Sequence, residues 1–200
     1  MRHSSGRVVY ARETLKLWNS NRTAPTSFRN DFLLNILPGH NGVGEGMAFV
    51  LANNPSLPSN NSGQWLSICN NRTGDTKMEP VVDVEFDTRK SYKDDLDDNH
   101  VGININSIKS IWQYSLSNLS IILPSGSYIR ASIRYHGTSK LFQVFLVQHS
   151  ILGQYFYQGD IYIDLSHLLQ DEIYLVFAGS TRNFTQLNQI KSWNFTTIGE

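Results

Sequence analysis

Short runs that are apolar, or that alternate apolar with polar residues, follow one another along the chain, and turn residues separate them. Helical periodicity is nearly absent, and only residues 166–172 resemble a helical turn. The segment 131–147 reads as a hairpin with its turn at 136–139. The pattern predicts an all-β fold, one antiparallel sandwich or barrel-like domain over residues 1–200. The runs that predict strands are 47–52, 81–86, 101–105, 119–123, 128–135, 141–147, 160–165 and 173–179.

Length and charge fit a single domain and exclude two classes of partner. Two hundred residues can bury a substantial core in one domain. The 17 basic and 17 acidic residues give a net charge of zero, and the basic residues are scattered, so no nucleic-acid partner is expected. Apolar runs stay well short of the roughly 18 residues that a membrane-spanning helix needs, so no membrane segment is predicted. The lone cysteine, Cys69, predicts no internal disulfide.

The N-terminal end and the asparagines bear on where the protein acts. Residues 1–15 contain no apolar stretch of the kind that signal peptides carry, and residues 1–6 are expected to be disordered. Six Asn-x-Ser/Thr sequons nevertheless favour the secretory route and an extracellular location. The candidate N-glycosylation sites are Asn21, Asn60, Asn71, Asn118, Asn183 and Asn194.

Seven carboxylates lie within residues 83–98. Asp83, Glu85 and Asp87 alternate with apolar residues, so the pleat of a strand sends all three side chains to one face. Like charges on one face repel each other, and burying any of them unpaired is costly. The pattern therefore favours a cation at this face.

The residues that follow can complete a metal site or form a solvated loop. Segment 88–98 is polar and adds four aspartates, and His100 opens the next apolar strand. Carboxylate oxygens suit calcium, whereas a site that adds an imidazole suits manganese or zinc. An exposed acidic loop with a capping histidine explains the same spacing, so the residues alone leave both interpretations open.

Several blocks of the chain resemble a known family. The segment VEFDT…D…NHVGININSIKS is similar to the metal-binding signature of the legume-type (L-type) lectins, and DLDDNHVGININ resembles lectin-like ectodomains of plant receptor kinases. The resemblance covers nearly the whole chain in the family's order. It implies a flattened jelly-roll sandwich that binds glycans or glycoproteins and is not an enzyme. The other blocks that carry it are GRVVYARETLKLW, GEGMAFVLA, SGQWLSICN and DLSHLLQDEIYLVFAGSTRN…IKSWNF.

The resemblance also implies two neighbouring ions, Mn²⁺ and Ca²⁺, beside the sugar-binding loops. Glu85, Asp87, Asp95 and His100 match the ligands of the transition metal. Asp87 and Asp95 would also bridge to the calcium ion. Cations in these positions would neutralise carboxylates that otherwise repel each other.

The calcium half of this site departs from the family's pattern. The family's calcium-binding asparagine is matched by Ser91, whose hydroxyl is a shorter and weaker ligand. The preceding aromatic position, whose backbone carbonyl binds calcium, is matched by Arg89. The resemblance therefore implies that the manganese half is better preserved than the calcium half.

Four positions correspond to the family's sugar-binding residues. Glu45 matches an aspartate that grips sugar hydroxyls, and Gly63 matches a glycine that donates its backbone N–H. Ser91 replaces the asparagine that also contacts sugar, and Arg182 lies in the loop that sets sugar preference. Displaced or missing groups weaken a site tuned to hydroxyls. The alternative to a lectin is thus a degenerate lectin-like module that binds a non-sugar ligand or a protein partner.

Two further expectations concern catalysis and assembly. The alternation in DVEFD resembles the cleft strand of sandwich-fold glycosidases, but the metal-type partners in the next loop argue against catalysis. The family's first edge strand, which pairs with the region 191–198, would precede this chain and is expected to be missing. An unpaired edge promotes association, so the chain is predicted to aggregate or to form a homo-oligomer.

Overall fold

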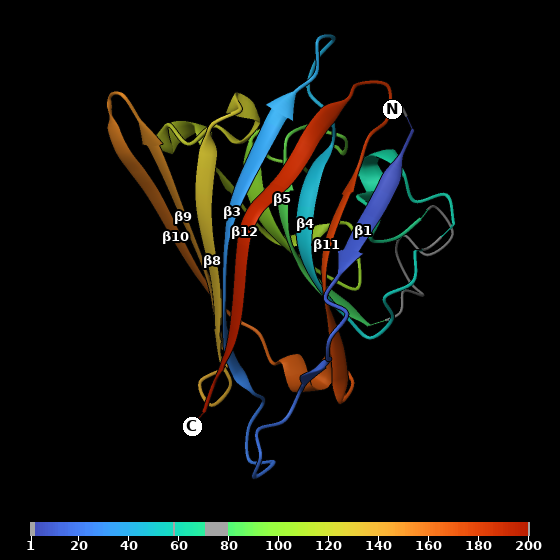
Figure 1. The fold of residues 1–200 in the computed structure, drawn as a ribbon, viewed down its shortest axis with the longest axis vertical. Helices are drawn as coiled ribbons and strands as arrows, with labels where there is room; N and C mark the ends of the chain where they lie inside the picture. The colour runs from blue at the N-terminus through green and yellow to red at the C-terminus, as the bar shows by residue number, and fades with distance from the viewer. Residues whose placement is uncertain (1–2, 58, 71–79, 200) are drawn as a thin grey trace.

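The computed structural model describes residues 3–57, 59–70 and 80–199, which form two antiparallel sheets packed face to face (Figure 1). Among these residues the helical elements are four short 3₁₀ turns, η1 (Gly63–Trp65), η2 (Ser117–Leu119), η3 (Leu123–Ser125) and η4 (Leu165–His167). The first sheet contains β1 (Ser5–Val9), β2 (Leu15–Lys16), β4 (Gly46–Ala52), β5 (Val81–Asp87), β6 (His100–Ile105), β7 (Ser110–Ser115) and β11 (Glu172–Ser180). The second contains β3 (Ser27–Pro38), β8 (Tyr128–His136), β9 (Leu141–Ser150), β10 (Gly153–Tyr162) and β12 (Gln186–Ile198).

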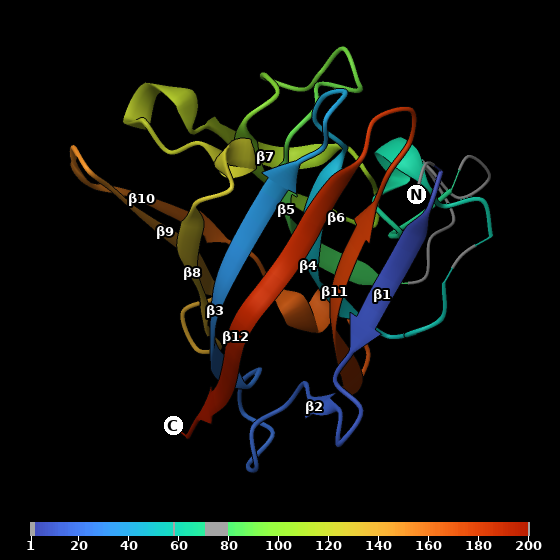
Figure 2. The ribbon, with the colours of Figure 1, turned by 45° about the horizontal axis from the view of Figure 1, so that its top comes forward.

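The order of the strands places the acidic strand β5 near the middle of its sheet. The seven-stranded sheet runs β1-β11-β4-β5-β6-β7, with β2 paired to β11, and the five-stranded sheet runs β10-β9-β8-β3-β12 (Figure 2). Neighbouring strands that are distant in sequence, such as β11 and β4, make this a sandwich and not a simple series of hairpins. The predicted all-β antiparallel fold is confirmed.

Aromatic side chains from both sheets meet in the middle of the core. Phe32 on β3 is 2% exposed and lies between three rings of the opposite sheet. Its ring centroid is 6.3 Å from that of Phe49, 5.8 Å from that of Phe86 and 5.0 Å from that of Phe177. Rings at these separations attract each other beyond the effect of their buried area. Phe32 therefore joins the two sheets at their centre.

Residues 119–123 do not form the strand that their apolar character predicts. They lie in and between η2 and η3, and side chains satisfy their backbone groups. The amide of Asn99 donates to the carbonyl of Ile121 at 2.8 Å and accepts from the N–H of Leu123 at 2.8 Å. The N–H of Ile122 donates to Gln148 at 2.8 Å. With these partners Ile121 and Leu123 can be buried without a neighbouring strand.

Several strands escaped prediction because polar residues mask their alternation. Residues 153–159 lie outside the predicted strands but form most of β10, an edge strand that exposes Gln154, Phe156 and Gln158. β3 was also missed, because its polar Asn30 does not look like a core residue. In the structure Asn30 is buried and accepts a hydrogen bond of 2.6 Å from the indole of Trp193. Buried side-chain pairs of this kind cannot be read from sequence spacing.

The expectation of disorder over residues 1–6 is wrong for Ser5 and Gly6. Both belong to β1, where they pair with Ser180 and Gly179 of β11. The N–H of Gly6 also donates to the hydroxyl of Ser67 at 3.1 Å. An unpaired edge of β11 gives the N-terminal residues a partner, which offsets the entropy lost on ordering them.

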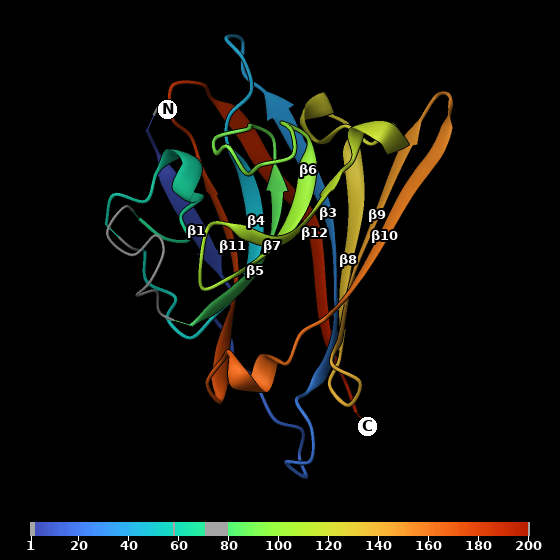
Figure 3. The same cartoon turned by 180° about the vertical axis from the view of Figure 1, so that it is seen from behind.

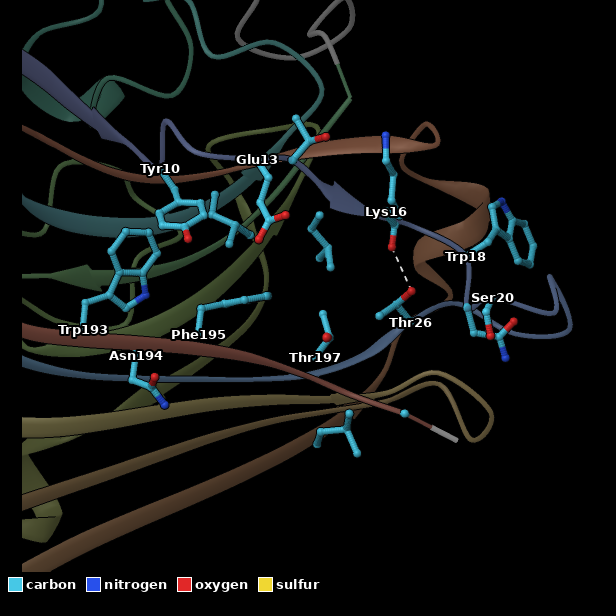
Figure 4. Close-up of a pocket in the computed structure, with 16 residues that line it drawn as sticks. Tyr10, Glu13, Lys16, Trp18, Ser20, Thr26, Trp193, Asn194, Phe195 and Thr197 are labelled. Carbon is cyan, nitrogen blue, oxygen red and sulfur yellow. Dashed lines mark hydrogen bonds between the residues drawn. The ribbon is translucent and has the colours of Figure 1, made fainter.

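The outer edge of β12 has no neighbouring strand among the described residues. β12 ends the five-stranded sheet and pairs there with β3 alone. A groove of about 570 Å³ runs beside it toward β2, and Tyr10, Trp193 and Phe195 line its apolar part (Figure 4).

Three connections reach the same end of the sandwich. The β3–β4, β5–β6 and β11–β12 loops all lie at the top in Figures 1 and 3, next to η1. Antiparallel pairing produces this arrangement, since β5 ends where β6 and β4 begin. Residues from these loops are therefore available to one site.

We expect Phe32→Ala to lower the free energy of unfolding by about 3–5 kcal/mol, because it leaves a cavity between the two sheets. Leu187→Ala is the matched control, since Leu187 is 52% exposed on β12. Denaturant melts of both variants measure the difference. Equal effects of the two substitutions would contradict the central place given to Phe32.

The unpaired edge of β12 should drive association that depends on protein concentration. Charges on an edge strand oppose such pairing, so Ser192→Lys with Thr196→Lys should shift the protein toward monomer. Gln143→Lys on β9, inside the sheet, is the control. Sedimentation velocity over a range of protein concentrations measures the fraction of monomer for each variant. A wild-type protein that stays monomeric throughout would refute the expectation.

Candidate functional site

The acidic face of β5 is buried. Asp83, Glu85 and Asp87 are 1%, 3% and 8% exposed, while Val84 and Phe86 on the other face belong to the main core. The shared face predicted from their alternation is thus present, and water reaches little of it. The interpretation as a solvated acidic loop does not hold for these three carboxylates.

Glu85, Asp87 and His100 converge on one point. One potential ligand atom from each lies within 4.8 Å of the others, and all three residues are buried. Pairing of β5 with β6 sets this arrangement, because Asp87 lies opposite His100 and Glu85 opposite Gly102. A Cβ atom at Gly102 would lie 2.5 Å from Oε1 of Glu85, so only glycine leaves room for that carboxylate. Two carboxylates and an imidazole at this spacing can hold a divalent ion.

The imidazole of His100 has the orientation that a metal ligand needs. Its Nδ1 lies 2.9 Å from the backbone carbonyl of Asp97, which can only accept, so Nδ1 carries a proton and donates it. Its Nε2 is buried, makes no hydrogen bond to the described residues, and lies 3.5 Å from Oε1 of Glu85. A backbone carbonyl that fixes the tautomer is typical of metal-binding histidines. The donor set and the orphaned nitrogen therefore fit a metal ion.

Burial and mutual repulsion shift the protonation of this cluster. Burial raises the pKa of Asp87 well above its usual range, the charge of Glu85 raises it further, and His100 lowers it. Burial lowers the pKa of His100, but Glu85 and Asp87 outweigh that effect and raise it to about 9. Without an ion, the cluster therefore keeps a proton at neutral pH, and a divalent cation would replace it.

Asp95, the fourth predicted ligand, orders the loop beside this cluster. Its Oδ2 accepts the backbone N–H groups of Ser91 at 2.8 Å and Tyr92 at 2.6 Å. It does not belong to the group of converging ligand atoms found among the described residues. The ring of Tyr92 packs edge-on against Trp65 at 6.2 Å, within the smaller apolar cluster. Asp95 thus shapes the turn that approaches the cluster.

Two residues of the site were missed by sequence reasoning. The amide of Asn104 donates to Asp83 at 3.0 Å and to Glu85 at 2.9 Å, and the hydroxyl of Ser110 donates to Glu85. The sequence contained a signal for Asn104. His100, Gly102 and Asn104 occupy every second position of β6, so their side chains share one face. Ser110 gave no such signal.

Glu45, predicted to grip sugar hydroxyls, has partners within the protein. It is 3% exposed, and its Oε2 accepts the hydroxyl of Ser91 at 2.7 Å. Its Oε1 lies 3.7 Å from Nε of Arg89. The guanidinium of Arg89 in turn lies 4.6 Å from the centre of the Phe184 ring. The structure thus brings together Glu45, Arg89 and Ser91, three of the positions that depart from the family's pattern.

Gly63 and Arg182 meet at a second point of the same end. Gly63 has a φ of +73°, and its N–H donates to the carbonyl of Thr181 at 3.2 Å. A Cβ atom there would lie 3.2 Å from Cδ of Arg182, whose Nη1 donates to Gln64 at 2.8 Å. The N–H of Gly63, to which the family resemblance gives a role in sugar binding, therefore bonds to the β11–β12 loop.

A cleft of about 590 Å³ adjoins these loops. Arg89 and Lys90 line it on the segment after β5, and Asp97 and Asp98 line it on the segment before β6. Its remaining lining residues are Val43, Thr88 and Leu96. Clefts of this volume accommodate small ligands.

A family model described as Legume lectin domain matches residues 1–200. The chain belongs to the legume lectin domain family. It is 39% identical over 199 residues to a probable L-type lectin-domain containing receptor kinase S.5 of Arabidopsis thaliana. The aligned region covers 96% of this chain and 29% of that protein. It is 29% identical over 203 residues to agglutinin-2 of Cladrastis kentukea, with 98% of this chain and 67% of that one covered. The chain spans about three tenths of the length of the receptor kinases that it matches first.

Solved lectin structures share the fold. The metal-free form of lectin I-B4 from Griffonia simplicifolia matches with a TM-score of 0.84 and 27% identity over 99% of this chain and 82% of that one. Lectin II from Ulex europaeus matches with a TM-score of 0.82 and 28% identity over 97% of this chain and 82% of that one. The predicted jelly-roll sandwich is confirmed. The family is a non-enzymatic carbohydrate-binding fold, in agreement with the prediction that the legume lectin domain described here is not an enzyme.

The predicted glycosylation sites lie at the surface wherever the structure describes them. Five of the six sequon asparagines are exposed, and Asn71 lies outside the described residues. A search of the described part of the chain found no helix both long and apolar enough to cross a membrane. The exposed asparagines are Asn21, Asn60, Asn118, Asn183 and Asn194.

We expect a chelator to lower the melting temperature, and the loss to grow as the pH rises from about 6.5 to about 9. The raised pKa of His100, about 9, stabilises the metal-free fold below its unfolded pKa, and this contribution fades as the pH rises through 9. The raised pKa of Asp87 adds a cost when that carboxyl ionises. Ion binding displaces these protons and so strengthens with pH.

Thermal melts of the protein with and without chelator, at each pH, measure this loss. Glu85→Gln should remove most of it, whereas Glu13→Gln, distant from β5, should not. A loss that does not change with pH would contradict the assignment of His100 as a ligand.

Proposed function

We propose that this legume lectin domain binds carbohydrate at the loops around the acidic cluster, and that divalent ions order those loops. The observation that carries the proposal is the buried convergence of Glu85, Asp87 and His100, with Nε2 of His100 aimed at the carboxylates. Asp95 would join them as the fourth ligand. An ion there would neutralise the cluster and fix the segment that carries Arg89 and the loop residues after it.

We further propose Mn²⁺ at the imidazole-containing position and Ca²⁺ beside it, between Asp87 and Asp95. Imidazole with carboxylates suits the first ion, and oxygen ligands alone suit the second. Ser91 offers calcium only a hydroxyl oxygen, which is a shorter and weaker ligand than an asparagine carbonyl. The backbone carbonyl of Arg89 is the other proposed ligand. This supports a calcium site weaker than the manganese site.

The ligands proposed are glycans or glycoproteins met outside the cell. Lectin UEA-II, 27% identical with a TM-score of 0.83, was solved in complex with galactose. The relatives among receptor kinases and the exposed sequons support an extracellular role as the ectodomain part of a plant receptor. Glu45, Gly63, Ser91 and Arg182 surround the proposed sugar-binding end.

A second candidate function is a degenerate lectin-like module that binds a non-sugar ligand or a protein partner. One observation favours it. Glu45 and the N–H of Gly63 already have partners within the protein, so neither group is available to a sugar without a rearrangement. Hydrogen-bonding sites lose discrimination sharply when their groups are misplaced.

A glycan microarray followed by titration calorimetry, with Mn²⁺ and Ca²⁺ present, tests the proposal. We expect binding that a chelator abolishes and that Glu85→Gln weakens at least tenfold, because the loops lose their ion. Glu13→Gln should bind like the wild type. Folded, ion-loaded protein that binds no glycan on the array would favour the degenerate module.

A further inference from the structure

The cleft beside the metal cluster exposes cations where a carboxylate was expected to face the ligand. Glu45 is 3% exposed and has Ser91 and Arg89 as partners. Arg89 and Lys90, in contrast, line the cleft. We propose that the cleft takes an acidic saccharide, a hexuronic acid unit whose carboxylate binds Arg89 and Lys90. This inference rests on the proposed carbohydrate-binding function and names the class of sugar.

Arg89 is held in place before any ligand arrives. Its Nε lies 3.7 Å from Glu45, its guanidinium stacks 4.6 Å from the Phe184 ring, and its backbone N–H donates to Asp87 at 2.6 Å. The side chain is still 37% exposed. A guanidinium has five N–H donors, so the Nη groups can pair with a ligand while Nε faces Glu45. A planar, oriented fork of this kind matches a carboxylate with two parallel hydrogen bonds.

The departures at this site support one another. A glutamate at position 45 reaches Arg89, and the short Ser91 donates its hydroxyl to the same carboxylate. Buried charges need partners, and Glu45 has a hydrogen bond from Ser91 and an ion pair with Arg89 at 3.7 Å. The side chains of Arg89 and Lys90 therefore present hydrogen-bond donors on their wall of the cleft. A glutamate facing the ligand would instead have accepted hydrogen bonds from neutral hydroxyls.

The cleft also holds two acids, Asp97 and Asp98, so its preference depends on which charged groups are free to pair with a ligand. Asp97 is engaged, since its Oδ2 accepts the hydroxyls of Ser115 and Ser117 and its Oδ1 accepts the N–H of Asn99 at 3.1 Å. Asp98 is exposed, and its carboxylate can accept hydrogen bonds from sugar hydroxyls. A hexuronic acid offers a carboxylate to the two cations and hydroxyl donors to Asp98. A neutral hexose would offer no carboxylate to Lys90 or to the Nη groups of Arg89.

The test compares short galacturonic acid oligosaccharides with their methyl esters, which keep the shape and lose the charge. Titration calorimetry with Mn²⁺ and Ca²⁺ present should show the acid binding at least tenfold more tightly than the ester. Added salt should narrow the difference, because the contact is between exposed charges. A neutral oligogalactose of the same length should bind like the ester.

Variants of Arg89 assign the effect to this residue. Arg89→Gln should weaken binding of the acid roughly ten- to a hundredfold, in line with the loss of charged hydrogen bonds. Arg89→Lys should restore part of the affinity. Because Arg89→Gln leaves Glu45 without its cation, the double variant with Glu45→Gln separates this effect and should bind as weakly as the single one. Lys93→Gln, an exposed change in the same segment, is the matched control.

The outcomes separate this inference from the proposal on which it rests. Acid, ester and neutral sugar bound alike, with Arg89→Gln unchanged, would overturn the acidic class and leave carbohydrate binding intact. Binding of neutral sugars alone would do the same. No binding of any saccharide by folded, ion-loaded protein would overturn both. Preference for the acid that Arg89→Gln removes supports the inference.

Discussion

Three carboxylates are buried on one face of β5, and the residues around them must compensate their negative charge. Asp83, Glu85 and Asp87 cannot all stay ionised side by side without partners, because their repulsion grows as water is excluded. Asn104 donates to two of them, and the third lies opposite His100. The central position of β5 in its sheet explains why neither solvent nor a side-chain rearrangement can relieve the charge. A divalent ion bound there would resolve the same conflict.

The charged cluster also organises the segment that would meet a ligand. Carboxylate oxygens of Asp87 and Asp95 accept backbone N–H groups at Arg89, Ser91 and Tyr92, so the segment after β5 wraps around acids. Arg89 and Ser91 then contact Glu45 on another loop. Any change of charge at the cluster therefore reaches the cleft through one or two hydrogen bonds. Metal content and ligand binding should be coupled for this reason.

Fold prediction succeeded where a strand buries one apolar face and failed where side chains replace strand pairing. The strands at 81–87 and 141–150 show clear patterns, and the structure contains both. Residues 119–123 look equally apolar, yet Asn99 and Gln148 satisfy their backbone groups without a strand. The edge strand β10 was missed for a different reason, since Phe156 and Tyr162 lie exposed among polar residues on its outer face and obscure the alternation.

The sequence by itself determined the alternation of acids on β5, the glycine and histidine spacing of β6, and the family to which these belong. It could not decide which polar groups pair across loops. Glu45 lies 44 residues before Arg89 in the chain, and Ser91 lies 2 residues after it. Only the fold brings Glu45 to the other two. The same holds for Gly63 and Thr181. Such contacts depend on side-chain reach across two antiparallel connections, which tertiary structure alone sets.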